Sequence, residues 1–335
     1  MKATVYSTET TEARNEAIEA ARVALRENKA IVLPTDTVYG IAADAFSHAG
    51  VSTLLAAKGR SRTMPPPVLI FDEAVLPGLA DEVSDDATAL ARKFWPGALT
   101  LILYSQPSLS WDLGETQGTV ALRVPNDPLT IQLLREIGPL AVSSANKTGQ
   151  QAATTAEAAA EQLGEDVEVI IDGGRRPIGA HEDALPAEAL PSTIVDCTAD
   201  RLVVVREGAI SMEELRQVVP SIITKEELEA ENRQSTAERA EERRAASSLV
   251  EEAESPTASA PVGLGDGPRA SAPAAGSFNA HLVEGGQGTA RVDQMRTKES
   301  IRQEIARREA AVKPLSQSDA RKLLFDDADS HKSNE

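Results

Sequence analysis

The stretch from Ala30 to Arg62 reads AIVLPTDTVYGIAADAFSHAGVSTLLAAKGRSR. Its first apolar residues, Ile31–Leu33, are rich in β-branched side chains and predict a buried strand, which Pro34 ends because proline cannot donate to a strand ladder. The turn that follows, Thr35–Tyr39, offers hydroxyl groups and a carboxylate. Gly40 then lets the backbone approach a ligand closely. The stretch therefore predicts a polar site at the end of a strand.

A helix is expected after this turn, from Ala49 to Ala57, with Gly59 ending it. Three cations lie just past the helix: Lys58, Arg60 and Arg62. Taken singly, a Thr/Asp turn is ordinary turn chemistry, and cations at a helix C-terminus often only offset the helix dipole. Together, hydroxyl groups at one end and fixed cations at the other favour a polar ligand that carries phosphates.

The rest of the first 220 residues alternates between short apolar runs and amphipathic segments. Expected strands cover 31–33, 68–71, 99–103, 119–124, 140–142, 167–171, 193–196 and 202–205. Expected helices cover 11–28, 49–57, 85–94, 128–137, 154–163 and 211–219, the last two beginning with capping boxes at Thr154 and Ser211. Several strands follow one another directly, so a mixed, twisted α/β sheet flanked by helices fits better than a doubly wound parallel sheet.

Composition changes near residue 221. Eight of the ten aromatic residues precede residue 112, which places the best core-forming segment in the first part of the chain. We expect one catalytic domain over 1–220 and a charged, mostly disordered tail over 221–335, with helices at about 225–254 and 298–325. The second of these helices either frays or docks onto a partner that the sequence does not identify.

The charge balance limits the classes of function. Residues 1–220 carry a net charge of −13, which argues against broad, non-specific binding to nucleic acid or anionic membrane. The lone cysteine, Cys197, excludes an internal disulfide and a thiolate zinc cluster, and the four histidines show no metal-ligand spacing. The N-terminus lacks the apolar core of a signal peptide, and no apolar run is long enough to span a bilayer, so a cytoplasmic protein is expected.

Six short motifs occur in order over about 180 residues. The first two are PTDTVYG (34–40) and the Lys-x-Arg at 58–60; ALRVP (121–125) follows, then Ser-Ala-Asn (144–146), Pro-Ser-Thr (191–193) and Arg-Glu-Gly (206–208). This pattern resembles the YrdC/Sua5 family of threonylcarbamoyl-AMP synthases over residues 12–219. The resemblance implies a YrdC-like open sheet, and it covers none of the tail.

The resemblance also implies a reaction. L-Threonine, bicarbonate and ATP would give L-threonylcarbamoyl-AMP and pyrophosphate, which makes the protein a nucleotidyltransferase acting in tRNA t6A37 modification. Mg²⁺ would be held mainly by the ATP phosphates, since the sequence shows no carboxylate cluster typical of a metal site. The product would pass to the t6A transferase complex downstream.

Site residues are carried over motif by motif. The catalytic set is Lys58, Arg60 and Arg123. The threonine site would be formed by Thr35, Thr37, Tyr39, Arg123 and Ser192, and the ATP site by Lys58, Arg60, Thr119, Ser144, Asn146 and Arg206. Arg123 is a cation in an otherwise apolar strand, so it needs a carboxylate partner from the protein or from a ligand. No general base is evident among these residues, so positioning and electrostatics should carry the chemistry.

The sequence departs from the family pattern at three places. Met64 precedes Pro65–Pro67 where many relatives have Asn or Lys and then Pro-Leu. Leu69 lies near the position of a histidine that some members present to threonine, and Ala152 replaces a serine. These departures affect individual contacts to ATP and threonine.

Two other functions remain open at this stage. One is a YrdC-like module that binds double-stranded RNA or tRNA without synthase activity, using Lys58, Arg60, Arg62, Arg123, Lys147 and Arg206. The net charge of −13 and the absence of aromatic residues between these cations weaken it to at most a weak tRNA contact. The other is a paralogue that keeps the fold and has lost the threonine pocket.

Overall fold

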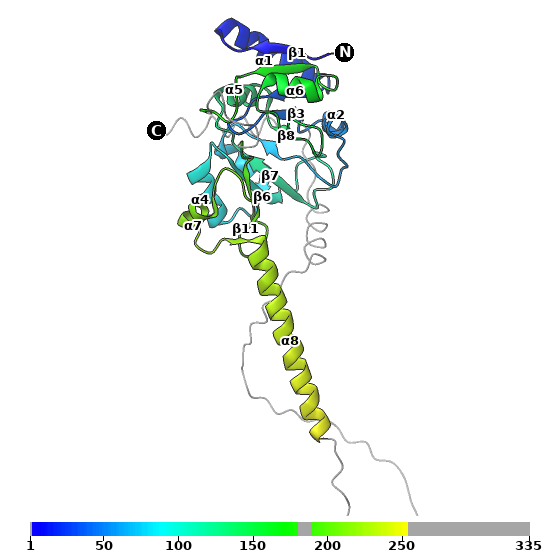
Figure 1. The fold of residues 1–335 in the computed structure, drawn as a ribbon, viewed down its shortest axis with the longest axis vertical. Helices are drawn as coiled ribbons and strands as arrows, with labels where there is room; N and C mark the ends of the chain where they lie inside the picture. The colour runs from blue at the N-terminus through cyan, green and yellow to red at the C-terminus, as the bar shows by residue number, and fades with distance from the viewer. Residues whose placement is uncertain (1, 180–188, 254–335) are drawn as a thin grey trace, which may run out of the picture. The chain divides into compact units, whose positions relative to one another are not determined.

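The structure is a computed structural model that describes residues 2–179 and 189–253, and Figure 1 shows its ribbon. The helix expected at 298–325 and the low-complexity part of the tail lie outside the described residues. Twelve strands of the described chain form one sheet: β1 (Thr4–Ser7), β2 (Ile31–Leu33), β3 (Gly40–Asp44), β4 (Val68–Leu69), β5 (Ala80–Asp81), β6 (Leu99–Ser105), β7 (Thr119–Arg123), β8 (Leu140–Ser144), β9 (Val169–Asp172), β10 (Thr193–Asp196), β11 (Val203–Arg206) and β12 (Ile223–Thr224).

The strand order is β1-β9-β2-β3-β8-β4-β7-β6-β10-β11-β12, with β5 pairing β6. The sheet combines parallel pairs, such as β2–β9 and β6–β10, with antiparallel pairs, such as β3–β8 and β6–β7. Figure 1 shows β3 and β8 side by side, with β7 and β6 adjacent to each other. The expected mixed, twisted sheet is confirmed.

The helices are α1 (Thr11–Arg26), α2 (His48–Lys58), η1 (Glu73–Val75), α3 (Leu76–Leu79), α4 (Asp85–Phe94), α5 (Pro128–Ile137), α6 (Ala156–Leu163), α7 (Met212–Val218) and α8 (Lys225–Ala253). Alternation along β2 separates two apolar clusters, because successive side chains point to opposite faces. Ile31 and Leu33 pack with α1 and α5, whereas Val32 packs with α2 and α6. The sheet is therefore covered on both faces around β2.

Four strands were not expected from the sequence, namely β1, β3, β5 and β12, and β3 matters most for the site. The helix α2 was predicted directly after the polar turn, but β3 intervenes and pairs antiparallel with both β2 and β8. Its sequence, GIAAD, is rich in small residues of low strand propensity, so its pairing on both sides decides its conformation. As a result the turn at 34–39 is the loop of a β2–β3 hairpin.

The helix ends follow from local capping. Asp127 caps α5 by accepting from Thr130 N, with Pro128 at the first helical position, and Ser211 and Glu214 form the expected capping box of α7. The box predicted at Thr154 is wrong by one residue: Thr155 caps α6 and accepts from Ala158 N. The Thr154 side chain is instead buried, and the backbone carbonyl of Thr154 accepts a hydrogen bond from Arg176 N.

Over the described residues, helix α8 begins in the compact unit that ends at Glu229, and its residues from Ala230 to Ala253 belong to a second unit. Its side chains over 225–240 are exposed or half-buried, in keeping with their charge. Among the helices of the described ranges, none has the length and hydropathy that crossing a bilayer requires.

Candidate active site

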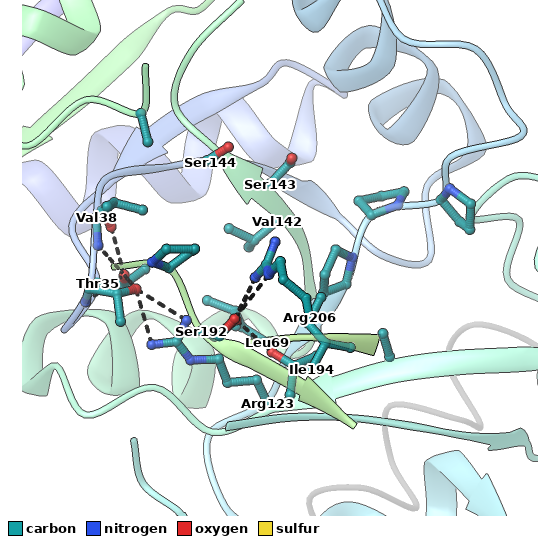
Figure 2. A pocket seen from close by; sticks show the side chains of 18 of the residues that line it. Thr35, Val38, Leu69, Arg123, Val142, Ser143, Ser144, Ser192, Ile194 and Arg206 are labelled. Carbon is teal, nitrogen blue, oxygen red and sulfur yellow. Dashed lines mark hydrogen bonds between the residues drawn. The ribbon is translucent and has the colours of Figure 1, made fainter. Parts of the chain in front are cut away.

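A cavity of about 570 Å³ opens where the β2–β3 hairpin loop, the segment after α2 and the ends of β7, β8, β10 and β11 meet. Figure 2 shows Ser143 and Ser144 across the cavity from Ser192 and Ile194. Ten of the residues predicted for the site line it: Thr35, Thr37, Tyr39, Arg60, Thr119, Arg123, Ser144, Asn146, Ser192 and Arg206. Segments that are far apart in the sequence therefore supply one concave site.

Arg123 enters this cavity from the end of β7. Its Nη2 donates to Asp36 Oδ1 across 2.6 Å, its Nε donates to Gly97 O across 2.9 Å, and both terminal nitrogens lie 3.3 Å from Thr37 Oγ1. Burial lowers the pKa of Arg123, and the Asp36 carboxylate opposes that shift. The required carboxylate partner is thus supplied by the protein, while the guanidinium still faces the cavity.

Arg206 lies at the end of β11 and is held by the Pro-Ser-Thr segment. Its Nη2 donates to Ser192 O at 2.7 Å and to Ser192 Oγ at 3.1 Å, and Ser192 Oγ lies 2.9 Å from Thr100 Oγ1. Figure 2 shows this side chain turned toward Ser192. Burial, and then the nearby Arg123 and Arg60, lower the pKa of Arg206.

Arg60 reaches the cavity because α2 ends in a left-handed residue. Gly59 has φ of 64°, which a residue without Cβ adopts at no steric cost, and its backbone N–H closes the helix on Ala56 O. Arg60 Nη1 donates to Ser143 Oγ at 3.0 Å, whereas its buried Nε has no hydrogen-bond partner. Burial lowers the pKa of Arg60. A buried donor without a partner is costly, so the protein alone leaves the hydrogen-bonding capacity of Arg60 incompletely satisfied.

The charges around the cavity are unbalanced. Three guanidinium groups, those of Arg60, Arg123 and Arg206, line it, and Asp36 is the carboxylate that pairs with one of them. The described residues that line the cavity include no aspartate or glutamate. Because like charges destabilise one another in a region of low dielectric constant, the site favours an anionic ligand.

Lys58 lies behind the cavity wall rather than in it. Its ammonium group donates to Ser144 O, to Asn146 O at 2.8 Å and to Asn146 Oδ1 at 3.3 Å, and the residue is 1% exposed. Burial, and secondarily Arg60, lower its pKa to about 7. In this structure Lys58 thus fixes the Ser-Ala-Asn loop and does not line the cavity.

Most polar side chains of the predicted set are also engaged within the protein. Thr35 Oγ1 donates to Val38 O at 2.6 Å, Thr119 Oγ1 donates to Thr116 O at 2.8 Å, and the Asn146 amide nitrogen donates to Lys147 O and Gln150 O, each at 2.8 Å. These bonds shape the loops that carry the backbone groups of the site.

The Tyr39 hydroxyl group is hydrogen-bonded within the protein. The hydroxyl donates to Gly174 O at 2.7 Å and accepts from Gly173 N, and its pKa is raised, chiefly by burial. Tyr39 thus joins the hairpin loop to the end of β9.

The residues that depart from the family pattern are near the ligand space. Leu69, Ala152 and Pro65–Pro67 line the cavity, and Met64 is 47% exposed. At Leu69 and Ala152 the cavity wall is therefore apolar, where the family pattern has a histidine and a serine.

Arg62 and Lys147, two of the cations named for the RNA-binding alternative, are not among the residues that line the cavity. Arg62 pairs with Asp112, which also contacts His48 Nδ1 at 2.6 Å, and Lys147 Nζ pairs with Asp166 Oδ2 at 2.5 Å. The side chains of these pairs are partly exposed, and each cation already has a carboxylate partner.

Five polar residues that line the cavity were not predicted from the sequence: Thr100, Thr116, Ser143, Gln150 and Gln151. Thr100 interrupts an apolar strand run, LTLIL, and that interruption was the available signal. Ser143 precedes a motif serine and had no separate signal. Over the described ranges, no group of three His, Cys, Asp or Glu residues is arranged to hold a metal ion.

Comparison with known proteins gives consistent matches. The Sua5/YciO/YrdC family model, described as "Telomere recombination", matches residues 23–208. A Mycobacterium tuberculosis (strain ATCC 25618 / H37Rv) protein named "Putative threonylcarbamoyl-AMP synthase" is 46% identical over 209 residues, which cover 62% of this chain and 91% of that protein. The Bacillus subtilis (strain 168) threonylcarbamoyl-AMP synthase is 38% identical over 61% of this chain and 57% of its own. The crystal structure of Pyrococcus abyssi Sua5 complexed with L-threonine matches with TM-score 0.59 and 32% identity, covering 67% of this chain and 62% of that one.

Proposed function

The chain belongs to the Sua5/YciO/YrdC family, and from that premise we propose that it is a threonylcarbamoyl-AMP synthase. It is a nucleotidyltransferase that joins L-threonine, bicarbonate and ATP and releases L-threonylcarbamoyl-AMP, pyrophosphate and water. The adenylate serves the t6A37 modification of tRNA. We assign the catalytic domain to residues 1–220.

The observation that carries this proposal is the cluster of Arg60, Arg123 and Arg206 around one cavity that no described carboxylate lines. Each of the three substrates carries a negatively charged group: ATP its phosphates, bicarbonate its single charge, and zwitterionic threonine its carboxylate. A cavity of about 570 Å³ is within the range of small-molecule sites. Charge and size together therefore fit a nucleotide beside a small amino acid.

The residues divide between the substrates by position. Arg123, with Thr37 beside it, would take the threonine carboxylate, for which its planar fork is suited. Arg60, with its unpartnered Nε, and Arg206 would offset the phosphate charge, next to Ser144 and the backbone of the Ser-Ala-Asn loop.

The reaction has two bond-forming steps. The threonine amine attacks the carbon of bicarbonate, water leaves, and a carbamate forms. A carbamate oxygen then attacks the α-phosphorus of ATP, and pyrophosphate leaves with the electron pair of the broken P–O bond. Arg60 and Arg206 would stabilise the charge that shifts to the leaving group, Arg123 would hold the threonine carboxylate, and the cavity would keep the reactants together.

We propose that Mg²⁺ travels with ATP. The described cavity lining offers hydroxyl groups, amides and cations but no carboxylate, so it does not fit a metal cage built by the protein. No step above is assigned to a protein-bound metal.

The RNA-binding alternative is weaker on the same grounds. Lys58 is buried, and Arg62 and Lys147 are paired with Asp112 and Asp166. What remains is a concave, three-arginine pocket, which is too small for a nucleic-acid backbone groove. We retain only a weak contact with tRNA, and we infer that the adenylate is passed to a t6A transferase complex in the cytoplasm. The tail's partner stays unidentified.

Pyrophosphate release tests the proposal. Purified protein is incubated with ATP, L-threonine and bicarbonate, and each component is left out in turn. We expect release only when all three are present, because the carbamate must form before the α-phosphorus is attacked. Release that continues without threonine would contradict the proposal, and salt-sensitive RNA binding without any release would favour the RNA-binding module.

A further inference from the structure

A second buried ion pair lies beneath the hairpin loop, outside the cavity. Arg176 Nη2 donates to Asp127 Oδ2 at 2.7 Å, and the two side chains are 7% and 3% exposed. Asp127 Oδ1 meanwhile accepts from Thr130 N at 2.9 Å, so one carboxylate both caps α5 and holds Arg176. A buried pair of this kind adds little net stability over an apolar packing but fixes a geometry.

The other side of the Arg176 guanidinium faces Tyr39. Its central carbon lies 5.8 Å from the centre of the Tyr39 ring, and its Nη1 donates to Gly173 O at 2.7 Å. Gly173 N and Gly174 O in turn bond the Tyr39 hydroxyl. Tyr39 is thus held at its ring face by Arg176 and at its hydroxyl by the same glycine pair.

The atoms around Gly173 are tightly packed. A Cβ placed on Gly173 would lie 2.7 Å from Arg176 Nη2 and 2.7 Å from Pro34 Cγ. Pro34 begins the hairpin loop, and its carbonyl accepts from Thr130 Oγ1 at 2.5 Å. Arg176 therefore sits where the end of β9, the start of α5 and the loop of the β2–β3 hairpin come together.

This loop carries the contacts to Arg123. Asp36 Oδ1 accepts from Arg123 and also from Asn126 N at 3.0 Å, just before α5, and Asp36 O accepts from Ile178 N at 3.2 Å. A shift of α5 or of the segment after β9 would thus move Asp36 and, through it, Arg123. Arg176 itself is not among the described residues that line the cavity.

We propose that Arg176 is a positioning residue for the amino-acid half of the site: it fixes the Thr35–Tyr39 loop by tying β9 to α5. The proposal rests on the function proposed above. It predicts a defect confined to threonine, because Arg60 and Arg206 belong to other segments and do not depend on this pair.

Steady-state kinetics of pyrophosphate release test it with Arg176→Met and Arg176→Lys. We expect Arg176→Met to raise the KM for threonine by about tenfold or more, with the KM for ATP within about twofold. Arg176→Lys keeps a charge for Asp127 but loses the fork and the stacking plane, so its threonine KM should lie between those of wild type and Arg176→Met. Arg22→Met, which breaks an exposed pair with Glu19 on α1, is the matched control and should change neither constant.

Asp127→Asn covers the case in which Arg176→Met does not fold. Asparagine still caps α5 but removes the partner charge, so a threonine-specific rise in KM is again expected. Equal rises in both KM values, or an unchanged threonine KM in a folded variant, would overturn the positioning role. A wild-type protein without threonine-dependent release would instead remove the proposed function, and the two failures are distinguishable.

Discussion

Arg123 Nη2 lies 2.6 Å from Asp36 Oδ1, and the two side chains are only 8% and 12% exposed. The pair joins the end of β7 to the β2–β3 hairpin loop and keeps a guanidinium group charged next to the cavity. The sequence left open whether the carboxylate partner of Arg123 comes from the protein or from a ligand. Because Arg123 pairs with Asp36 and also lines the cavity, the two interpretations are compatible.

Charge removal at this pair separates its two roles. Arg123→Met should abolish most threonine use, with a rise in threonine KM of roughly ten- to a hundredfold, and should destabilise the fold by roughly 3 kcal/mol because Asp36 is left buried and unpaired. The double variant Asp36→Asn with Arg123→Met should recover stability but not threonine use. Denaturant unfolding and KM measurements check both, and recovery of threonine turnover in the double variant would show that Arg123 has no role in binding.

The two arginines of the Lys-Gly-Arg-Ser-Arg segment provide an internal comparison. Arg60 lines the cavity, whereas Arg62 pairs with Asp112. Arg60→Gln should raise the KM for ATP by about tenfold or more, because a charge-assisted contact to phosphate is lost, and Arg62→Gln should change it by less than about threefold. ATP titrations of pyrophosphate release measure this; equal effects would argue against Arg60 as the phosphate contact.

Because the pKa of Lys58 is lowered in the folded protein, the protein should become more stable as the pH rises above about 7. The Lys58 pKa is about 7 in the folded protein against an ordinary value of 10.5, so between these values the unfolded chain binds more protons. The free energy of unfolding should therefore rise with pH across this window, and the penalty of the buried charge is complete below pH 7. Relative to Lys58→Met, wild type should gain about 1 kcal/mol per pH unit from pH 7.5 to 10. Urea unfolding at several pH values checks it, and parallel pH curves for the two proteins would contradict it.

Gly114 locks the loop after β6 onto the segment that carries Arg60. It has φ of +113°, and a Cβ there would lie 2.6 Å from Arg62 O, which also accepts from Glu115 N. Gly138, with φ of +102° and nothing within 4 Å, shares the backbone strain without the clash. Gly114→Ala should thus lower the melting temperature by several degrees more than Gly138→Ala and also raise the KM for ATP. Thermal unfolding of the two variants decides it, and similar losses would count against the clash.

Local patterns in the sequence account for much of the fold. Helix α4 and strand β10 have the bounds expected from their apolar spacing. The Ser211–Glu214 capping box begins helix α7 where it was expected. Strand β3 was missed because its alanines and glycine carry little strand propensity, and pairing with β2 and β8 decides it. Such non-local pairing leaves no trace in a short window of sequence.

The site shows the same division. Motif residues that face the cavity, such as Arg60 and Arg206, could be named from their motifs, but the orientation of a side chain could not. Lys58 was expected at the phosphates and instead donates to Ser144 O and Asn146 O, because α2 ends against the Ser-Ala-Asn loop. Arg176 carried no motif and became visible only through its distance to Asp127 and Tyr39.

The central claim is that threonine is carboxylated before it is adenylated, and the mass of the product tests it most directly. Purified protein is incubated with ATP, L-threonine and ¹³C-labelled bicarbonate, and the nucleotide products are measured by mass spectrometry. We predict a threonylcarbamoyl-AMP that carries one ¹³C and is absent when threonine is omitted. An unlabelled threonyl-AMP, or AMP without any amino-acid adduct, would contradict the account.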